Sequence, residues 1–323
     1  MADGVFWVST PLPFAGLRQV NLWLLKDGDG WTMVDCGFGY EAARAVIAAA
    51  WRETLGEAGI TRLVVTHYHP DHIGNSAWIS ERWGVRPFMT EGEWSAATVA
   101  IRDKRDDAVA RRVGFYRAHG LDEGRLAVLK NGATFYSTGV RLPPSFQRLS
   151  DGDGLTIGAD RWTIVVGEGH SPEHAALYCA DRRLLISGDQ ILPTITTNIS
   201  VWPTEPDSDP LNLFLRSCRR FAELLHPDTL VLPSHRLPFR NVHRRLEALA
   251  RHHEERLDLI LRSTDREIAA ADLIDVLFPR KLDGHQMGFA MGEAIAHLNH
   301  LVTRGRMERV TDGSGATRYR KLG

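Results

Sequence analysis

The chain has 323 residues, enough for one large domain with a smaller one, or for two domains of ordinary size. Apolar residues make up 43% and charged residues 24%, which excludes a disordered chain and predicts a packed core. The 39 basic and 40 acidic residues nearly cancel, so no overall charge draws the chain to nucleic acid or to an anionic membrane.

The cysteines and the N-terminus bear on the compartment. Cys36, Cys179 and Cys218 are widely spaced and form no CxxC pair, a pattern typical of neither a disulfide framework nor a zinc knuckle. The first residues lack a basic segment followed by an apolar one, and no run of about 18 apolar residues occurs. We therefore expect a cytoplasmic protein in a reducing compartment, with no membrane partner.

The first part of the chain alternates between strand and helix patterns. Short strands separated by Pro-rich and DGDG turns are predicted over 5–9, 20–26 and 31–36. A helix over 41–59, a strand over 61–66 and a helix over about 72–83 follow. From about 90 to 145 the chain becomes polar and helical and then rich in Gly and Pro, which we interpret as an insertion or a lid.

Strand patterns return in the second half. They are RLAVLK (125–130), DRWTIVVG (160–167), ALYCA (176–180), RLLIS (183–187) and TLVLPS (229–234). Beyond 240, three helical segments and a terminal strand pair give the outline of a winged helix. We predict a catalytic domain over 1–239, with the helical insertion, and a winged-helix-like domain over 240–323.

The strongest chemical signal is THYHPDH, directly after the predicted strand over 61–66. On an extended loop, positions two apart share a face, so His67 and His69 can reach one ion. Asp71 and His72, at the turn into the next helix, then point to a neighbouring ion. Imidazole nitrogen and carboxylate oxygen are ligands that zinc favours. The alternative is a surface loop in which Asp71 only caps the helix.

Three further candidate ligands each follow a short apolar strand. They are His170 after TIVVGEG, Asp189 after RLLISG and His235 after TLVLPS. A single histidine after a strand is more often a hydrogen-bonded structural residue. Strand ends on one edge of a sheet can nevertheless converge on one site, and four such coincidences favour a metal centre.

The motifs THYHPDH, GEGHSPEH, SGDQ and PSH, in this order, resemble those of the metallo-β-lactamase fold superfamily over residues 1–239. The resemblance implies an α/β (α+β) fold, an αββα sandwich with a two-metal site between its sheets. It implies that one metal is held by His67, His69 and His170, the other by Asp71, His72 and His235, and that Asp189 bridges them. It also makes Asp35, in VDCG, a residue that steadies the ligand loop, although a turn carboxylate is the alternative.

The implied chemistry is that of a metal-dependent hydrolase. Two divalent ions, zinc first and manganese or iron as alternatives, share a water and supply hydroxide at pH 7. We expect a metal-bridging hydroxide to attack the carbonyl of a small-molecule thioester, ester or lactone, with catalytic roles for Asp71, His72 and Asp189. In outline the chain is closest to glyoxalase II-like hydrolases and to lactamase-beta-like hydrolases with a C-terminal winged helix.

Other activities fit the motifs less well. A metal-dependent endoribonuclease is the main alternative, since six basic residues lie between 304 and 321, but residues 1–239 carry 24 basic and 28 acidic side chains, a net charge of −4. Asp189 and the missing leader argue against a β-lactamase. Iron-dependent persulfide dioxygenases share the first motif too, so this activity stays a less favoured alternative. The tail can cover the site, bind RNA or form a homodimer.

Several residues stay open. His174 can support the site or bond to backbone at a helix start, and Tyr68 can face substrate or core. His252 and His253 are predicted on a solvated helix face. Phe115, Tyr116 and His119 favour core packing over a substrate cleft. Aromatic residues suited to enclosing an acyl group are Trp94, Phe115, Tyr116, Phe135, Tyr136 and Phe146.

Overall fold

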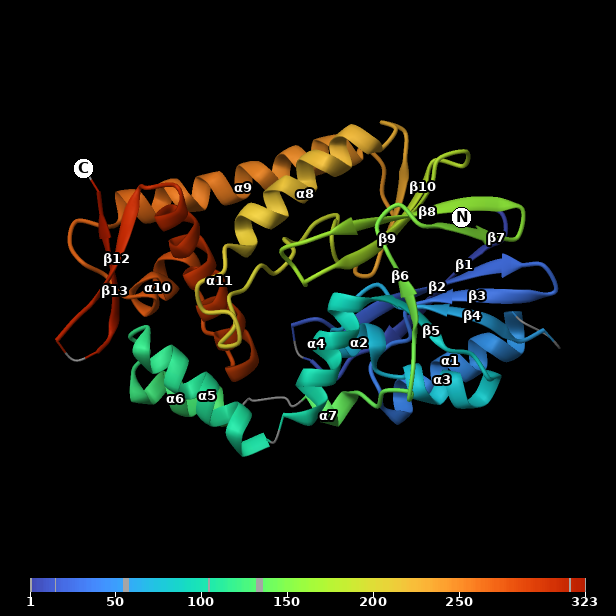
Figure 1. Cartoon of the computed structure of the whole chain (residues 1–323), viewed down its shortest axis with the longest axis horizontal. Helices are drawn as coiled ribbons and strands as arrows, with labels where there is room; N and C mark the ends of the chain where they lie inside the picture. The colour runs from blue at the N-terminus through green and yellow to red at the C-terminus, as the bar shows by residue number, and fades with distance from the viewer. Residues whose placement is uncertain are drawn as a thin grey trace. The chain divides into compact units, whose positions relative to one another are not determined.

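The computed structural model of the chain describes residues 2–14, 16–54, 58–103, 105–131, 136–313 and 315–322 (Figure 1). Two compact units are present, and each combines segments that are distant in sequence. The first unit comprises residues 1–102, 135–197 and 221–245, and the second comprises residues 103–134, 198–220 and 246–323.

The first unit contains two β-sheets. The six strands of the first sheet, in spatial order, are β1 (Val5–Pro11), β2 (Gln19–Asp27), β3 (Gly30–Val34), β4 (Ile60–Val64), β5 (Pro87–Thr90) and β6 (Gln147–Leu149). The five strands of the second are β11 (Leu230–Pro233), β10 (Leu184–Gly188), β9 (His174–Cys179), β8 (Asp160–Gly167) and β7 (Gly154–Ile157). β3 to β6 pair in parallel, as do β10 and β11, so the carboxyl ends of these strands meet at common sheet edges.

Alternating residues of β2 show how the first unit is layered. Val20, Leu22 and Leu24 pack in a hydrophobic cluster with residues of the flanking helices. Trp23 and Leu25 point the other way, into a second cluster with residues of β7 to β11. Because side chains alternate along a strand, one strand serves both clusters. The two sheets therefore pack face to face, as the sequence predicted (Figure 1).

Helices cover the outer face of the first sheet. The helices of this unit include α1 (Glu41–Thr54), α2 (Pro70–Ile73), α3 (Ser76–Trp83), α4 (Glu91–Arg102) and α7 (Tyr136–Gly139). Ile47 and Trp51 of α1 and Ile79 of α3 are buried in the cluster on that face. The predicted helix over 41–59 is observed over Glu41–Thr54, and residues 55–57 lie outside the described part of the chain.

A break at Gly74 and Asn75 divides the predicted helix over 72–83 into α2 and α3. A Cβ at Gly74 would lie 2.5 Å from a backbone oxygen of a neighbouring segment, so only glycine fits. The Asn75 side chain donates to the carbonyl oxygens of Cys36 and Phe38, at 2.9 and 2.8 Å. These contacts hold the short helix α2 against the end of β3.

The second unit is mainly helical. It includes α5 (Arg105–Ala118), α6 (Glu123–Asn131), the 3₁₀ helix η1 (Ala270–Leu273), α10 (Ile274–Leu277), α11 (Gly284–Thr303) and the hairpin of β12 (Met307–Thr311) and β13 (Thr317–Lys321). α8 (Pro210–Leu224) and α9 (Val242–Arg262) contribute residues to both units. Among the described helices, none combines the length and the apolar character needed to span a membrane.

The strand prediction for RLAVLK is wrong, because these residues belong to α6. Leu126 and Leu129, three positions apart, are both buried, and α6 packs on α11. That spacing places them on one face of a helix. Glu123 in the first turn and Lys130 in the last turn also suit the helix dipole.

The prediction of a solvated face for His252 and His253 is wrong for His253, which is fully buried. Its Nδ1 lies 3.2 Å from Nε2 of His297 on α11. The surrounding charges in the sequence reflect the exposed side of α9, whereas His253 lies on the side that faces α11.

The aromatic residues of the predicted insertion are divided between the units. Tyr116 is fully buried in the second unit, where its hydroxyl donates to the carbonyl of Gly288 at 3.0 Å, so its packing role is confirmed. Trp94 and Phe146 stack at 4.7 Å between ring centroids and pack against the helix-covered core of the first unit. Phe135 lies outside the described residues.

Candidate metal centre

The predicted ligands lie just after four strands of the first unit. His67 and His69 follow β4, and Asp71 and His72 lie in α2, which begins at Pro70. The other three residues follow β8, β10 and β11, and they are His170, Asp189 and His235 respectively. The structure brings all seven together as three overlapping groups that could hold metal.

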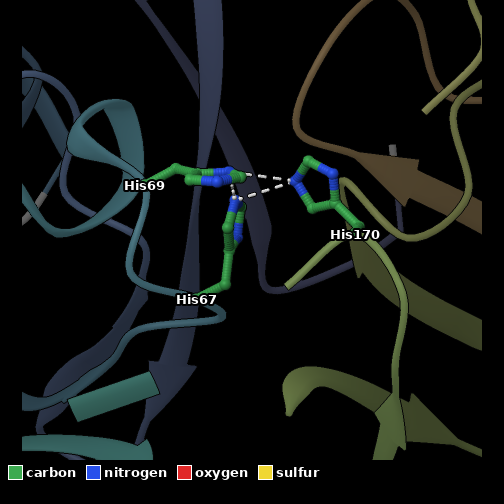
Figure 2. A group of neighbouring side chains, drawn as sticks. All are labelled: His67, His69 and His170. Carbon is green, nitrogen blue, oxygen red and sulfur yellow. Dashed lines mark hydrogen bonds between the residues drawn. The ribbon is translucent and has the colours of Figure 1, made fainter. Parts of the chain in front are cut away.

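The first group consists of three histidines whose ring nitrogens converge (Figure 2). His67 Nε2 lies 2.9 Å from His69 Nδ1 and 3.3 Å from His170 Nε2, and the latter two nitrogens are 3.1 Å apart. Tetrahedral zinc with Zn–N bonds of 2.0–2.1 Å would place ligand nitrogens about 3.3 Å apart. The observed spacing is close to that value.

The second group contains Asp71, His72 and His235. His235 Nε2 lies 3.4 Å from Asp71 Oδ2, and His72 Nε2 lies 3.6 Å from the same oxygen. Both imidazoles are buried, whereas the Asp71 side chain is 14% exposed. This group therefore has one carboxylate at its solvent side and two histidines beneath it.

Asp189 lies between the two groups. Its Oδ1 is 3.4 Å from His235 Nε2 and 3.7 Å from His72 Nε2. Its Oδ2 is 3.7 Å from His170 Nε2. One carboxylate thus presents an oxygen to each group, which is the arrangement that a bridging ligand requires.

Hydrogen bonds on the far side of the ring orient three of the histidines, His67, His72 and His235. Thr66 Oγ1 donates its proton to Asp35, so the same oxygen accepts a hydrogen bond from His67 Nδ1 at 3.0 Å. The proton of His67 is therefore on Nδ1, and Nε2 keeps its lone pair. His72 Nδ1 donates to Asp35 Oδ2 at 2.8 Å. His235 Nδ1 donates to the carbonyl of Gln19 at 2.8 Å. In each case the nitrogen that faces the site is free to bind a metal.

The pKa shifts differ between the groups. Burial and the neighbouring His170 ring lower the pKa of His69 to about 3, so the His69 ring is neutral. Burial alone would lower the pKa of His235, but Asp189 and Asp71 outweigh it and raise the pKa to about 10. Asp71 and Asp189 therefore face positive charge on His235, which a divalent cation can also supply.

Unpaired buried atoms provide a test of whether metal fits. Within the described residues, His72 Nε2, His235 Nε2 and Asp189 Oδ1 are buried without a hydrogen-bond partner. Such atoms cost free energy unless they find a ligand. All three face one another, and all are atom types that bind zinc. The residues present therefore fit divalent metal ions.

Asp35 and His174 support the ligands. The Asp35 carboxylate accepts from Thr66 N at 2.7 Å and from Thr66 Oγ1 at 2.9 Å, besides His72. His174 begins β9 rather than a helix, and its Nε2 accepts the backbone N–H of Asp189. Tyr68 is half-buried and packs against the helix-covered core of the first unit.

The sequence reasoning missed Thr66 and Glu93. Glu93, in the first turn of α4, is fully buried and accepts three hydrogen bonds from the loops that carry His67, His69 and His170. An acidic residue in the first turn of a helix is ordinarily explained by the helix dipole, so EGEW gave no distinctive signal. Thr66, at the end of a predicted strand, adjoins His67 and was a detectable candidate.

Family comparisons cover most of the chain. A family model described as "Metallo-beta-lactamase superfamily" matches residues 15–235, and one described as "Metallo-beta-lactamase-like, C-terminal domain" matches residues 257–322. Neither description mentions a winged helix, so that assignment stays a prediction.

Individual proteins are similar over most of their length. A "Probable metallo-hydrolase YqjP" from Bacillus subtilis is 26% identical over 93% of this chain and 92% of that protein. The human protein named "Acyl-coenzyme A thioesterase MBLAC2" is 25% identical over 73% of this chain and 79% of that protein.

Two solved structures are similar to the whole chain. A beta-lactamase domain protein from Burkholderia ambifaria has a TM-score of 0.92 and 41% identity, and the match covers 100% of this chain and 93% of that one. A metallo-beta-lactamase family protein from Thermus thermophilus has a TM-score of 0.84 and 30% identity, with 99% of each chain covered.

Proposed function

Because the chain belongs to the metallo-beta-lactamase superfamily, we propose that this metal-dependent hydrolase attacks the carbonyl group of a small-molecule thioester, ester or lactone with the help of two divalent ions. One observation carries the proposal. The two oxygens of Asp189 face two separate sets of histidine nitrogens, which suits a pair of ions and a bridging carboxylate. Zinc is the metal we favour for these donors.

The proposed ligands follow from the two groups. His67, His69 and His170 would hold one ion, Asp71, His72 and His235 would hold the other, and Asp189 would contact both. Bound divalent ions lower the pKa of water toward neutrality and polarise a carbonyl oxygen. The chain supplies the geometry, because Asp35, Thr66 and Gln19 fix the ligand rings.

The burial of the ligands indicates where substrate approaches. His67, His72 and His235 are buried, whereas His69 and Asp71 are half-buried. A substrate carbonyl therefore reaches the site from the side of His69 and Asp71. The buried side keeps bulk water away from the ligand nitrogens, which strengthens their electrostatic interactions.

The substrate class rests on two arguments. The similar human protein is named as an acyl-coenzyme A thioesterase, which supports a thioester carbonyl. Residues 1–239 carry a net charge of −4, and a long polyanion such as RNA would meet an unfavourable potential there. A carbonyl-centred small molecule is therefore preferred to RNA.

A hydrolysis screen on metal-analysed protein tests the proposal. Acyl-coenzyme A, S-acyl glutathione, aryl esters, lactones, a β-lactam and short RNA are compared with and without added Zn²⁺ or Mn²⁺. We expect turnover of a thioester, ester or lactone that depends on metal and falls steeply in His69→Ala. Cleavage of RNA at low enzyme concentration, with every carbonyl substrate inert, would replace this function by an endoribonuclease.

A further inference from the structure

Glu93 joins the two halves of the three-histidine group. Its Oε2 accepts the backbone N–H of Tyr68, the residue between His67 and His69, at 2.9 Å. Its Oε1 accepts from the hydroxyl of Ser171, the residue after His170, at 2.6 Å. One carboxylate thus accepts hydrogen bonds from the loop after β4, in the first sheet, and from the loop after β8, in the second sheet.

Further hydrogen bonds join Glu173, in the turn after His170, to the start of α4 and the residue before it. Glu173 N donates to Glu93 Oε1 at 2.7 Å, and Glu173 Oε2 accepts from Gly92 N at 2.7 Å. Thr90 Oγ1 donates to the carbonyl of Glu173 at 2.8 Å. A Cβ at Gly92 would lie 2.9 Å from Glu173 Oε2, so glycine permits this close approach.

The burial of Glu93 distinguishes it from its neighbour. Glu93 is fully buried, and a buried carboxylate is tolerated only where several donors compensate its desolvation. Glu91, two residues earlier on the same helix, is exposed and pairs with exposed Arg148 at 2.6 Å. An acidic residue that served only the helix dipole would not need burial or three donors from two other segments.

The three-histidine group brings together residues that are distant in the sequence. His67 Nε2 lies 2.9 Å from His69 Nδ1 and 3.3 Å from His170 Nε2. His67 and His69 come from the loop after β4, whereas His170 comes from the loop after β8. The spacing of the three ring nitrogens therefore depends on how these two loops are held relative to each other.

We propose that Glu93 is a positioning residue that sets the distance between His170 and the pair His67 and His69, and thereby the metal affinity of the three-histidine group. This inference rests on the proposed function, because it assumes that the group binds a metal ion. Supporting groups of this kind change metal affinity by about 10–100-fold when they are replaced.

The test compares Glu93→Gln with wild type and with Glu91→Gln as the matched control. A glutamine at position 93 has one acceptor oxygen, so its amide NH₂ must face either the Tyr68 N–H or the donors of the 171–173 turn. Zn²⁺ affinities are measured by chelator competition, and Co²⁺ absorption follows the filling of each group. We expect at least a 10-fold loss of affinity at the three-histidine group, no change at the second group, and recovery of turnover at excess Zn²⁺.

Further variants keep the test decisive. Ser171→Ala removes one of the three donors and should weaken the same group less than Glu93→Gln does. Glu93→Ala should weaken it most, and if that variant does not fold, the two milder ones decide. Folded Glu93→Gln with wild-type affinity at the three-histidine group, or with equal losses at both groups, overturns the inference. Failure of wild type to bind two ions or to cleave any carbonyl substrate would instead contradict the proposed function.

Discussion

The backbone N–H of Asp189 donates a hydrogen bond to Nε2 of His174, and the two atoms are 3.1 Å apart. Gly188, the residue before Asp189, has φ +52°, and a Cβ there would lie 2.3 Å from the same ring nitrogen. The glycine and the buried imidazole together fix the direction in which the Asp189 side chain leaves the backbone. The position of the proposed bridging carboxylate therefore depends on a residue that is not itself one of the proposed ligands.

Replacing His174 by Leu should destabilise the chain and weaken metal binding. The Asp189 N–H would lose its acceptor in a buried site, which costs about 1–3 kcal/mol. His174→Gln should retain most of the metal affinity, because a glutamine oxygen can accept the same bond. Urea unfolding and metal titration of both variants make the comparison. Equal affinities in the Leu and Gln variants would show that the hydrogen bond does not position Asp189.

Asp35→Asn should reduce metal affinity with little effect on the backbone. Asp35 has φ +60°, a left-handed conformation that asparagine also tolerates. The amide, however, cannot accept all three bonds from Thr66 N, Thr66 Oγ1 and His72 Nδ1. We expect about a 10–100-fold loss in metal affinity.

Asp35→Ala supplies the comparison for that variant. It removes the same acceptors and adds strain at a positive φ, so its unfolding free energy should fall further than that of Asp35→Asn. Wild-type zinc affinity in Asp35→Asn would contradict a role for this carboxylate in orienting His72.

The convergence of the candidate ligands could be predicted from the sequence because of where these residues lie along strands. His170, Asp189 and His235 each follow a short apolar strand, and β8, β10 and β11 end at one edge of their sheet. Their convergence is therefore a consequence of topology, which a strand pattern can reveal. The same reasoning placed His67 and His69 after β4.

Contacts between distant segments could not be predicted in this way. The donors to Glu93 come from Tyr68 and from Ser171 and Glu173, and no local pattern links these segments. The failure at RLAVLK has a different cause, since a short apolar run fits a strand or a helix equally well. His253 was misplaced because its charged neighbours on α9 concealed a buried position that contacts His297 of α11.

Asp189→Ala should lose metal and activity together. The carboxylate faces both groups and offsets the repulsion between two cations, so its removal affects each ion. Elemental analysis of dialysed protein should give close to two divalent ions per chain in wild type and at most one in the variant. Asp209→Ala is the control, because Asp209 pairs with His300 in the second unit. Two ions retained in Asp189→Ala would refute the bridge.

A buried histidine pair in the second unit should make stability depend on pH. His253 Nδ1 lies 3.2 Å from His297 Nε2, and His297 Nδ1 donates to the carbonyl of Glu293 at 2.8 Å. Burial, with the adjacent histidines and Arg256, lowers the pKa of His253 to about 2, and burial lowers that of His297 to about 3. Burial also raises the pKa of Glu293 to about 7, although Arg256 lies 3.3 Å away.

These shifts have opposite signs for stability. In the unfolded chain histidine takes up a proton below about pH 6.5, whereas buried His253 and His297 stay neutral. Each of the two therefore lowers the free energy of unfolding by about 1.4 kcal/mol for every pH unit below that value. Glu293 acts in the other direction, because below its folded pKa of about 7 the native state binds the extra proton. Between about pH 6.5 and 4.5 the effect of the two histidines exceeds that of the single carboxyl group, so the free energy of unfolding decreases as the pH is lowered.

His253→Phe isolates one histidine from this balance. The variant should be less stable than wild type at pH 7.5, since His297 loses its hydrogen-bond partner, but the difference should shrink by about 1 kcal/mol at pH 5.5. Urea unfolding at both pH values, with chelated metal, measures this. Phe214→Leu is the control, because Phe214 packs against His253 at 5.6 Å between ring centroids and does not titrate. It should destabilise the chain equally at both pH values. A His253→Phe difference that is independent of pH would show that His253 does not remain neutral in the folded chain.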